Sequence, residues 1–343
     1  MESNTHKASQ QLMPGFEPSE KDLIDRALAQ PLEDKIRRSI EMFRLYEAGA
    51  LRMSPDGYYL AFSGGKDSCV IKQLAIEAGV KFRPVYNNTT IDPPELIRYI
   101  RKHHADVAWN NHRTPMLRRL VENPNGPPTR LARWCCEVYK EQGGKGCLRV
   151  IGVRIAESER RARLWKEFQP HRTDGAILAP IVYWTDEDVW AFIRSRNLPY
   201  CELYDQGFKR LGCVGCPMAG PAGQRKEFAR WPGYERAWKK AIFLFFETWK
   251  GVPLERPYWE KLAPRKKHSP LATQFGVGTV DSAKEAQLLG VPIGTQVRTQ
   301  LHWWRWFEPM KSPQELWDWW RSGKASEGEG EAQCFQEEMM MDV

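Results

Sequence analysis

A glycine pair between an expected strand and an expected helix constrains the fold of this chain more than any other feature. Residues 58–62 are apolar enough for a buried strand, and residues 67–77 have the pattern of a helix that ends at Gly79. Between them the chain reads Ser63-Gly64-Gly65-Lys66, and adjacent glycines allow a sharp turn. Such a turn leaves backbone N–H groups at the helix N-terminus free to bind an anion. The segment therefore predicts a strand, a phosphate-binding turn and a helix.

Further strands and helices alternate along the first two thirds of the chain. After a loose lead-in over residues 1–30, the apolar spacing predicts helices over residues 32–49, 94–104 and 186–196, the last capped by Thr185. Strands are expected over residues 80–86, 105–109, 148–153 and 177–182. This alternation predicts an α/β fold, a doubly wound and mostly parallel Rossmann-like sheet.

The composition changes along the chain, and four regions are expected. Residues 1–50 form an N-terminal helical lead-in, 51–225 the sheet domain, 226–321 a basic and aromatic helical extension, and 322–343 an acidic disordered tail. Six of the fifteen tryptophans lie between residues 303 and 320. We favour their packing in a helical layer over a platform on which bases stack.

Charge and composition narrow the cellular setting and the partners. The acidic tail carries −5, so residues 1–321 carry +13, which favours anionic partners such as nucleotides and nucleic acid. No apolar run is long enough to span a bilayer, and the N-terminus lacks the apolar centre of a signal peptide, so we expect a cytoplasmic protein with no membrane contact. Eight cysteines are too few and too uneven for a secreted disulfide framework.

The glycine turn is neither of the common nucleotide loops. A P-loop needs glycines five residues apart and a dinucleotide fold needs G-x-G-x-x-G, whereas Gly64 and Gly65 are adjacent. The stretch resembles the SGGxDS loop of the PP-loop ATP pyrophosphatases. The resemblance implies an adenine nucleotide alpha-hydrolase-like fold that binds ATP with Mg²⁺. Lys66 would offset charge on departing pyrophosphate and Asp67 would help to place the metal, as the catalytic pair. The implied ATP-binding residues are Ser63, Gly64, Gly65, Lys66, Asp67 and Ser68.

Four cysteines indicate a metal site. Cys135-Cys136 are adjacent, and Cys213 and Cys216 follow as a CxxC pair with proline directly after it. Cysteine followed by proline is typical of ferredoxin-type clusters, whereas structural zinc sites usually offer two spaced pairs. The pattern resembles the 4Fe-4S ligation of the phosphoadenosine phosphosulfate (PAPS) reductase family, and also the ATP-pyrophosphatase component of DNA phosphorothioation systems. The resemblance implies a 4Fe-4S cluster, with zinc as the alternative.

Three other stretches resemble the same family. Gly152 to Arg161 is similar to its G-x-R-x-x-E-S-x-x-R element, in which Arg154 and Arg161 would bind phosphate or sulfate oxygens. Residues 198–217 resemble the segment that leads into the second cysteine pair, and residues 87–95 stand where the family has a nucleotide-contacting loop. The resemblance covers residues 55–220, about half the chain.

The chain also departs from the family. Reductases that form sulfite carry a C-terminal Glu-Cys-Gly-Leu-His type motif, and this chain has none; its one late cysteine, Cys334, lies in the acidic tail. Cys69, Cys147 and Cys201 match no motif and are interpreted as ordinary thiols. The nucleophile of the reductase reaction is therefore missing from the expected place.

Three functions fit these observations. The first is an ATP-dependent, adenylating and pyrophosphate-releasing sulfur transfer to nucleic acid, closest in type to the phosphorothioation component, with a cysteine desulfurase or other sulfur donor as partner. The second is a sulfonucleotide reductase that forms sulfite with another nucleophile. The third is a nucleic-acid-binding regulator in which the nucleotide and the cluster act as sensors. The missing C-terminal cysteine motif favours the first over the second.

Overall fold

The structure is a computed structural model of the 343-residue chain. It describes residues 19–123, 126–130, 132–170, 175–250, 278–279, 296–297 and 310–323. Cys334 and the tryptophans at positions 303, 304 and 306 lie outside these ranges.

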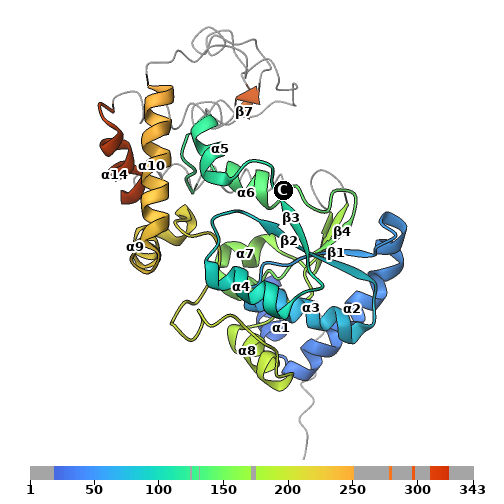
Figure 1. Ribbon diagram of the computed structural model, residues 1–343. Coiled ribbons are helices and arrows are strands. Elements are labelled where there is room, and N and C mark those ends of the chain that lie inside the picture. The colour runs from blue at the N-terminus through green and yellow to red at the C-terminus, as the bar shows by residue number, and fades with distance from the viewer. Residues whose placement is uncertain are drawn as a thin grey trace, which may run out of the picture.

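A six-stranded, mostly parallel sheet forms the centre of the molecule (Figure 1). Its strand order is β3-β2-β1-β4-β6-β5, and only β5 runs antiparallel to its neighbour. Except for this edge strand, the order is the 3-2-1-4-5 arrangement of Rossmann-like sheets, which confirms the predicted fold class. The strands are β1 (Tyr58–Ala61), β2 (Phe82–Asn88), β3 (Ala108–Asn111), β4 (Leu148–Val150), β5 (Phe168–Pro170) and β6 (Ala176–Leu178).

Helices cover the sheet, and alternate side chains of β1 are buried beneath them. Tyr58 and Leu60 are fully buried, and the Tyr58 hydroxyl donates a hydrogen bond of 2.5 Å to the carbonyl of Phe43 on α2. α2 packs against α3, and α3 packs against α8. The helical elements of this region are α1 (Glu20–Leu28), α2 (Leu32–Met53), α3 (Lys66–Ala78), α4 (Pro94–His103), the 3-10 turn η1 (Ile155–Glu157), α7 (Glu159–Leu164) and α8 (Asp186–Ser195).

The predicted elements are present, with shifted ends. Gly79 adopts a left-handed φ of 70° at the end of α3, and Thr185 caps α8 through a capping box with Asp188, both as predicted. The described part of the lead-in contains the helix α1, which Ser19 caps through a capping box with Asp22 and which was not predicted. β2 and β3 begin two and three residues later than predicted, and α2 passes Gly49 because the next residues are strong helix formers.

The antiparallel edge strand β5 was not predicted. It has only three residues and ends in Pro170, whose missing N–H restricts proline to the edges of sheets. Such a short segment gives no alternation that could identify a strand.

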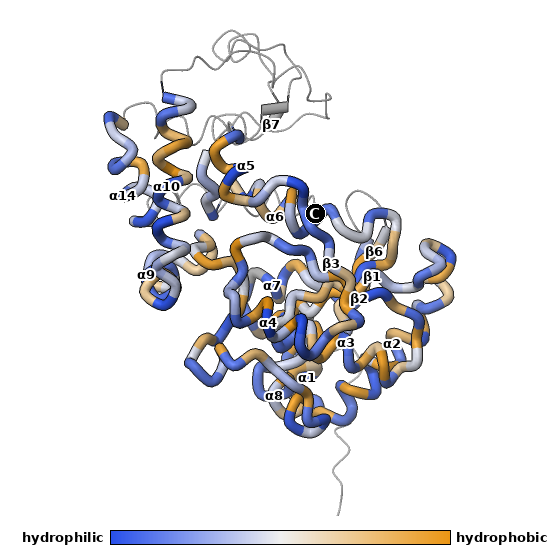
Figure 2. The backbone as a smooth tube through the Cα atoms, viewed as in Figure 1, coloured by the Kyte–Doolittle hydropathy of each residue, from blue (hydrophilic) through white to orange (hydrophobic). Residues whose placement is uncertain are grey.

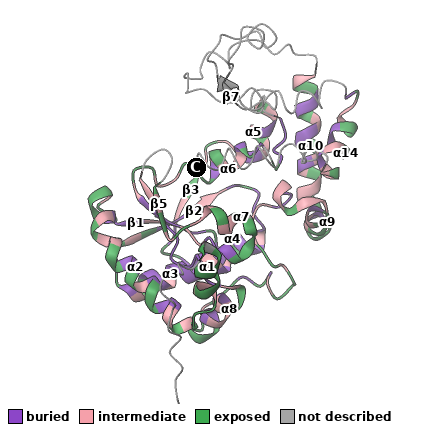
Figure 3. Cartoon of the chain, turned by 180° about the vertical axis from the view of Figure 1, so that it is seen from behind, coloured by how far each residue is buried: buried purple, intermediate pink, exposed green. Residues whose placement is uncertain are grey.

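A second group of helices stands to one side of the sheet and includes the Trp-rich C-terminal helix (Figure 1). Trp320 stacks on Trp238 with ring centroids 4.7 Å apart and donates a hydrogen bond to the carbonyl of Pro128. Figure 2 shows apolar residues on α5 and α10, and Figure 3 shows buried residues along α10. Trp317 and Trp320 therefore pack a helical layer, as predicted. The elements are α5 (Met116–Glu122), α6 (Trp134–Tyr139), η2 (Pro217–Ala219), α9 (Gly220–Arg230), α10 (Pro232–Trp249) and α14 (Pro313–Ser322); β7 (Gly278–Thr279) and β8 (Gln296–Val297) form a separate pair.

Candidate functional site

The glycine turn lies where the strand order of the sheet reverses. β1 has β2 on one side and β4 on the other, so the chain turns after β1 at the switch point between them. The segment after β4 leads to Gly152 and Arg154, and it meets the turn there, because a Cβ atom on Gly152 would stand 3.1 Å from Asp67. In open α/β sheets this crevice is the usual place for a ligand.

The two glycines of the turn have different reasons to be glycine. Gly64 has a φ of 73°, and a Cβ atom there would stand 2.8 Å from side-chain atoms of Leu96 and Ile100 on α4. Gly65 has an ordinary backbone conformation and serves as the N-cap of α3. Gly64 thus makes the turn possible, and Gly65 keeps the helix N-terminus open to approach.

The polar atoms of the turn are paired with oxygens of the protein itself. The N–H of Gly65 donates to Ser63 Oγ at 3.4 Å, and Ser63 Oγ donates to Ser68 Oγ at 3.3 Å. The N–H of Lys66, the first residue of α3, donates to the Tyr204 hydroxyl at 2.9 Å. The N–H groups of Gly65 and Lys66, which are expected to bind phosphate, are therefore each paired with a hydroxyl oxygen.

Beside the turn, two cations and two carboxylates form a network. Lys66 and Arg154, both buried, pair with Asp67 and Asp186: Arg154 Nε lies 2.6 Å from Asp67, and Lys66 Nζ lies 3.0 Å from Asp186. Burial opposes the charge of Asp186, but Lys66 and Arg154 outweigh this and hold its pKa below the usual value. The structure thus places Arg154, which was predicted from a separate stretch of sequence, in one network with Lys66 and Asp67.

Arg161 is linked to this network through Glu157. It stands on α7, half-buried, and its guanidinium pairs with Glu157 at 2.5 Å, while Glu157 also lies 3.9 Å from Arg154. Both arginines therefore belong to one chain of charges that leads away from the turn.

Sequence reasoning missed Asp186 and Tyr204. Asp186 is the first residue of α8, where an acidic residue is expected simply to stabilise the helix. Tyr204 lies in the segment that leads to the second cysteine pair, 138 residues after its partner Lys66. No local pattern signals either contact.

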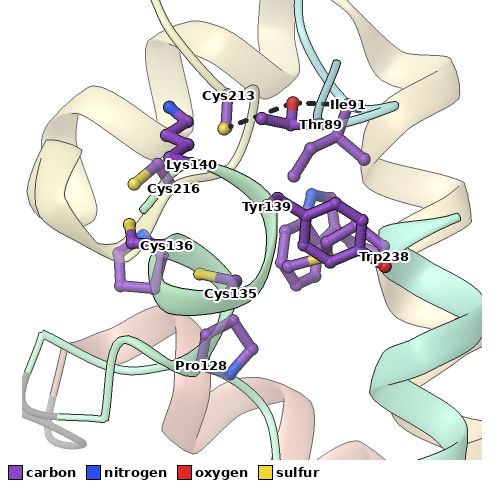
Figure 4. Close-up of a pocket in the computed structure, with 12 residues that line it drawn as sticks. Thr89, Ile91, Pro128, Cys135, Cys136, Tyr139, Lys140, Cys213, Cys216 and Trp238 are labelled. Carbon is purple, nitrogen blue, oxygen red and sulfur yellow. Dashed lines mark hydrogen bonds between the residues drawn. The ribbon is translucent and has the colours of Figure 1, made fainter. Parts of the chain in front are cut away.

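The four predicted cysteine ligands come together in one pocket (Figure 4). Cys135 and Cys136 stand on α6, whereas Cys213 and Cys216 flank the turn before η2. Figure 4 shows their sulfurs directed toward a common space, with the Lys140 ammonium nearby. The other lining residues are mainly apolar or aromatic: Thr89, Ile91, Met116, Pro128, Tyr139, Pro217 and Trp238.

Charge in this pocket favours thiolate at one cysteine. A hydrogen bond from Cys135, with the positive charges of Arg133 and Lys140, outweighs burial and holds the pKa of the Cys136 thiol below its usual value. Burial raises the pKa of Cys213 to about 12, and its thiol lies 3.5 Å from Thr89 Oγ1. Four cysteine side chains beside the Lys140 ammonium suit an anionic sulfur-bound group. Within the described ranges, no three His, Cys, Asp or Glu side chains are arranged to hold a metal ion.

Helices α9 and α10 hold the turn between Cys213 and Cys216. Glu227 accepts a hydrogen bond of 2.7 Å from the Gly215 N–H, and Gln224 donates one of 3.0 Å to the Gly215 carbonyl. Trp238 donates a third to the carbonyl of Val214. Burial raises the pKa of Glu227 to about 7.

The unassigned cysteines that are described are free thiols. Cys69 is buried on α3 against the Tyr99 hydroxyl, and burial raises its pKa to about 12. Cys201 is fully buried and Cys147 is partly exposed. Cys69, in the first turn of α3, is therefore part of the hydrophobic core.

The fold and the turn define a class of nucleotide-binding α/β proteins: a parallel sheet whose switch point carries a glycine turn and the N-terminus of a helix. Comparison with known families narrows the class. Residues 57–219, just under half of the chain, match the model of the phosphoadenosine phosphosulfate reductase domain.

Curated relatives match shorter parts of the chain. An uncharacterized protein of Methanocaldococcus jannaschii is 26% identical over 270 residues, 69% of this chain and 65% of the relative. Adenosine 5'-phosphosulfate reductase of Staphylococcus epidermidis is 39% identical over 67 residues, 20% of this chain and 28% of the relative. Adenosine 5'-phosphosulfate reductase 2 of Bacillus subtilis is 30% identical over 107 residues, 30% of this chain and 45% of the relative. The chain thus spans less than two thirds of these proteins.

The similarity to solved structures is low. The phosphoadenylyl-sulfate (PAPS) reductase of Candida auris, as a phosphate complex, has a TM-score of 0.38 at 16% identity and covers 58% of this chain and 97% of that one. FMN adenylyltransferase of Candida glabrata, with FAD and inorganic pyrophosphate, has a TM-score of 0.37 at 18% identity and covers 57% and 70%. Among the described helices, none is long and apolar enough to cross a membrane.

Proposed function

We propose that the protein activates an oxygen of a nucleic acid with ATP and replaces that oxygen with sulfur. One observation carries the proposal: the glycine turn and the cysteine pocket open from the same edge of the sheet. The turn follows β1, and Thr89 and Ile91 of the pocket follow the adjacent parallel strand β2. A nucleotide at one site and sulfur chemistry at the other would therefore be neighbours.

The residues of the turn would bind the β and γ phosphates of ATP. The N–H groups at the start of α3, with Ser63 and Ser68, provide neutral donors, and Lys66 offsets the charge of departing pyrophosphate. Asp67 would help to hold Mg²⁺, and Arg154 and Arg161 would contact phosphate or sulfate oxygens.

The reaction would proceed in two displacements. The target oxygen attacks the α-phosphorus of ATP, and pyrophosphate leaves. Hydrosulfide, released by a thiol reductant from the persulfide of a cysteine desulfurase or other donor, then attacks the phosphorus or carbon that bears the adenylated oxygen, and that oxygen departs as part of AMP. The charge of +13 on residues 1–321 supports a nucleic acid substrate, with DNA phosphorothioation as the closest type.

Cys135, Cys136, Cys213 and Cys216 would hold a 4Fe-4S cluster. Such a cluster takes one cysteine for each iron, which suits thiols that surround a space, whereas a zinc ion, the alternative, needs ligands that converge on one point. When bound, the cluster would supply iron and sulfide chemistry beside the nucleotide.

Pyrophosphate release tests the proposal. Protein purified anaerobically should release pyrophosphate from ATP when nucleic acid is present, and Lys66→Met should slow this about 100-fold, because a charge that stabilises the leaving group is lost. Lys81→Met, which removes an exposed lysine at the start of β2, is the matched control. No release with any DNA or RNA by iron-loaded protein would refute the function.

A second candidate, the sulfonucleotide reductase, is favoured by the names of the relatives. It predicts sulfite from adenosine phosphosulfate or PAPS with a thioredoxin-like reductant. Because Cys69 and Cys201 are buried, its nucleophile would have to be Cys147 or Cys334. Sulfite formation that is lost in Cys334→Ser would establish this function in place of the first.

A further inference from the structure

The Tyr204 hydroxyl lies at the N-terminus of α3, the helix that follows the glycine turn. Its hydroxyl lies 2.9 Å from the backbone nitrogen of Lys66, the first N–H of α3, and this is the distance expected for an anion oxygen at that donor. A Cβ atom on Gly65 would stand 3.4 Å from the same hydroxyl oxygen. The hydroxyl therefore sits directly on the open end of the helix.

One aromatic contact and two buried neighbours hold Tyr204 in this position. Its ring packs edge-on against Trp190 of α8, with centroids 5.1 Å apart, and its neighbours Cys201 and Leu203 are fully buried. Burial raises the pKa of Tyr204 well above its usual value, so the group is a neutral hydroxyl. A neutral oxygen satisfies the helix N-terminus less well than a doubly charged phosphate does.

We propose that Tyr204 is a further residue of the phosphate site, one that competes with the ligand. Its hydroxyl pairs with the Lys66 N–H when the site is empty and yields that donor to a phosphate oxygen when ATP or pyrophosphate binds. The inference rests on the proposed function, because it takes the turn to be a pyrophosphate site. On this proposal the Tyr204 hydroxyl weakens the binding of the phosphate groups and does not affect the binding of adenosine.

Tyr200 provides a matched control within the same segment. Its ring also packs edge-on against Trp190, with centroids 5.2 Å apart, but its hydroxyl donates to Asp205 at 3.1 Å and does not reach α3. Tyr204→Phe and Tyr200→Phe thus each remove one hydroxyl and keep the ring, and only the first frees the Lys66 N–H.

Calorimetric titration with pyrophosphate, Mg-ATP and adenosine tests the proposal on the full-length protein. Tyr204→Phe should bind pyrophosphate and ATP about fivefold more tightly than the unaltered protein, the factor that corresponds to one ordinary hydrogen bond. Adenosine affinity should not change, and Tyr200→Phe should match the unaltered protein with all three ligands.

Each other outcome overturns the inference. Equal affinities would mean that the hydroxyl does not compete, and weaker pyrophosphate binding by Tyr204→Phe would mean that the hydroxyl donates to phosphate. Thermal unfolding of both variants shows whether the fold is intact. If the unaltered protein binds neither ATP nor pyrophosphate, the proposed function fails as well, so the two failures can be told apart.

Discussion

At the scale of single residues, a buried chain of hydrogen bonds lies under the glycine turn. Tyr99 donates to the carbonyl of Pro199 at 2.7 Å, so the contact of 2.9 Å between its hydroxyl and His104 Nε2 requires the imidazole to donate. His104 Nδ1 then accepts from the Lys72 ammonium at 3.2 Å. His104 is therefore neutral, with its proton on Nε2.

This arrangement predicts a pH dependence of stability. Burial, with the charge of Lys72, lowers the pKa of His104 from 6.5 to about 4, although Asp106 opposes this. Between pH 6.5 and 4 the unfolded chain therefore binds the extra proton. Neutral His104 therefore contributes about 3 kcal/mol to the free energy of unfolding. This contribution is fully present above pH 6.5 and is lost as the pH falls toward 4.

Urea unfolding at several pH values measures this contribution. His104→Gln keeps one donor and one acceptor but cannot titrate. The unfolding free energy of the unaltered protein should therefore fall relative to that of His104→Gln as the pH falls from 6.5 to 4. His103→Gln, at an exposed position of α4, should keep the original slope. Parallel pH curves for His104→Gln and the unaltered protein would contradict the prediction.

At the scale of elements, the turn between Cys213 and Cys216 depends on helices that follow it in the sequence. Glu227 and Gln224 on α9 bond both sides of Gly215, whose φ of 78° places it in the left-handed region. Phe228 and Trp238 fill the space beside it, since a Cβ atom there would stand within 2.7 Å of both side chains. Side chains of α9 and α10, which lie outside the CxxC motif, thus hold the turn that separates Cys213 from Cys216.

Loss of the carboxylate should therefore weaken the pocket. Glu227→Ala leaves the buried N–H of Gly215 without its partner, and we expect a several-fold lower iron content after anaerobic reconstitution and a destabilisation of about 1–3 kcal/mol. Glu247→Ala, on the exposed face of α10, is the control. Unchanged iron content and stability in Glu227→Ala would show that the turn keeps its shape unaided.

The elements also show what sequence could and could not predict. The strand, turn and helix around Gly64 were predictable because a left-handed glycine and apolar periodicity are local signals. The short edge strand β5 gave no such signal. Cys135 and Cys213 could be assigned to one pocket only through a family resemblance, and the contacts of Asp186 and Tyr204 with α3 depend on tertiary packing.

At the scale of the whole molecule, the helical layer completes the core of the sheet region. The family match ends at residue 219, yet α10 packs on α5, and α14 packs on α10. Trp238, Phe245 and Trp320 are buried in the same cluster of side chains as Leu60 and Leu120. The boundary of the family match is therefore not a boundary of the hydrophobic core.

A chain that ends at residue 219 should fail to fold. Removal of α9, α10 and α14 would expose the apolar side chains of α5 and the wall of the cysteine pocket, far more surface than the stability of a domain tolerates. Expression trials with near-UV circular dichroism and denaturant unfolding would measure this. Soluble protein with a cooperative transition from residues 1–219 alone would contradict the prediction.

Trp238, a wall of the cysteine pocket, lies about a hundred residues after Cys135 in the chain. Synthesis proceeds from the N-terminus, and contacts of such sequence separation form late because a long loop must close first. On the ribosome, the glycine turn and its helix can therefore assemble while the cysteines still stand open on one side. The wall formed by Trp238 is complete only after α10 has emerged, so whatever the cysteines hold is enclosed later than the glycine turn and its helix are formed.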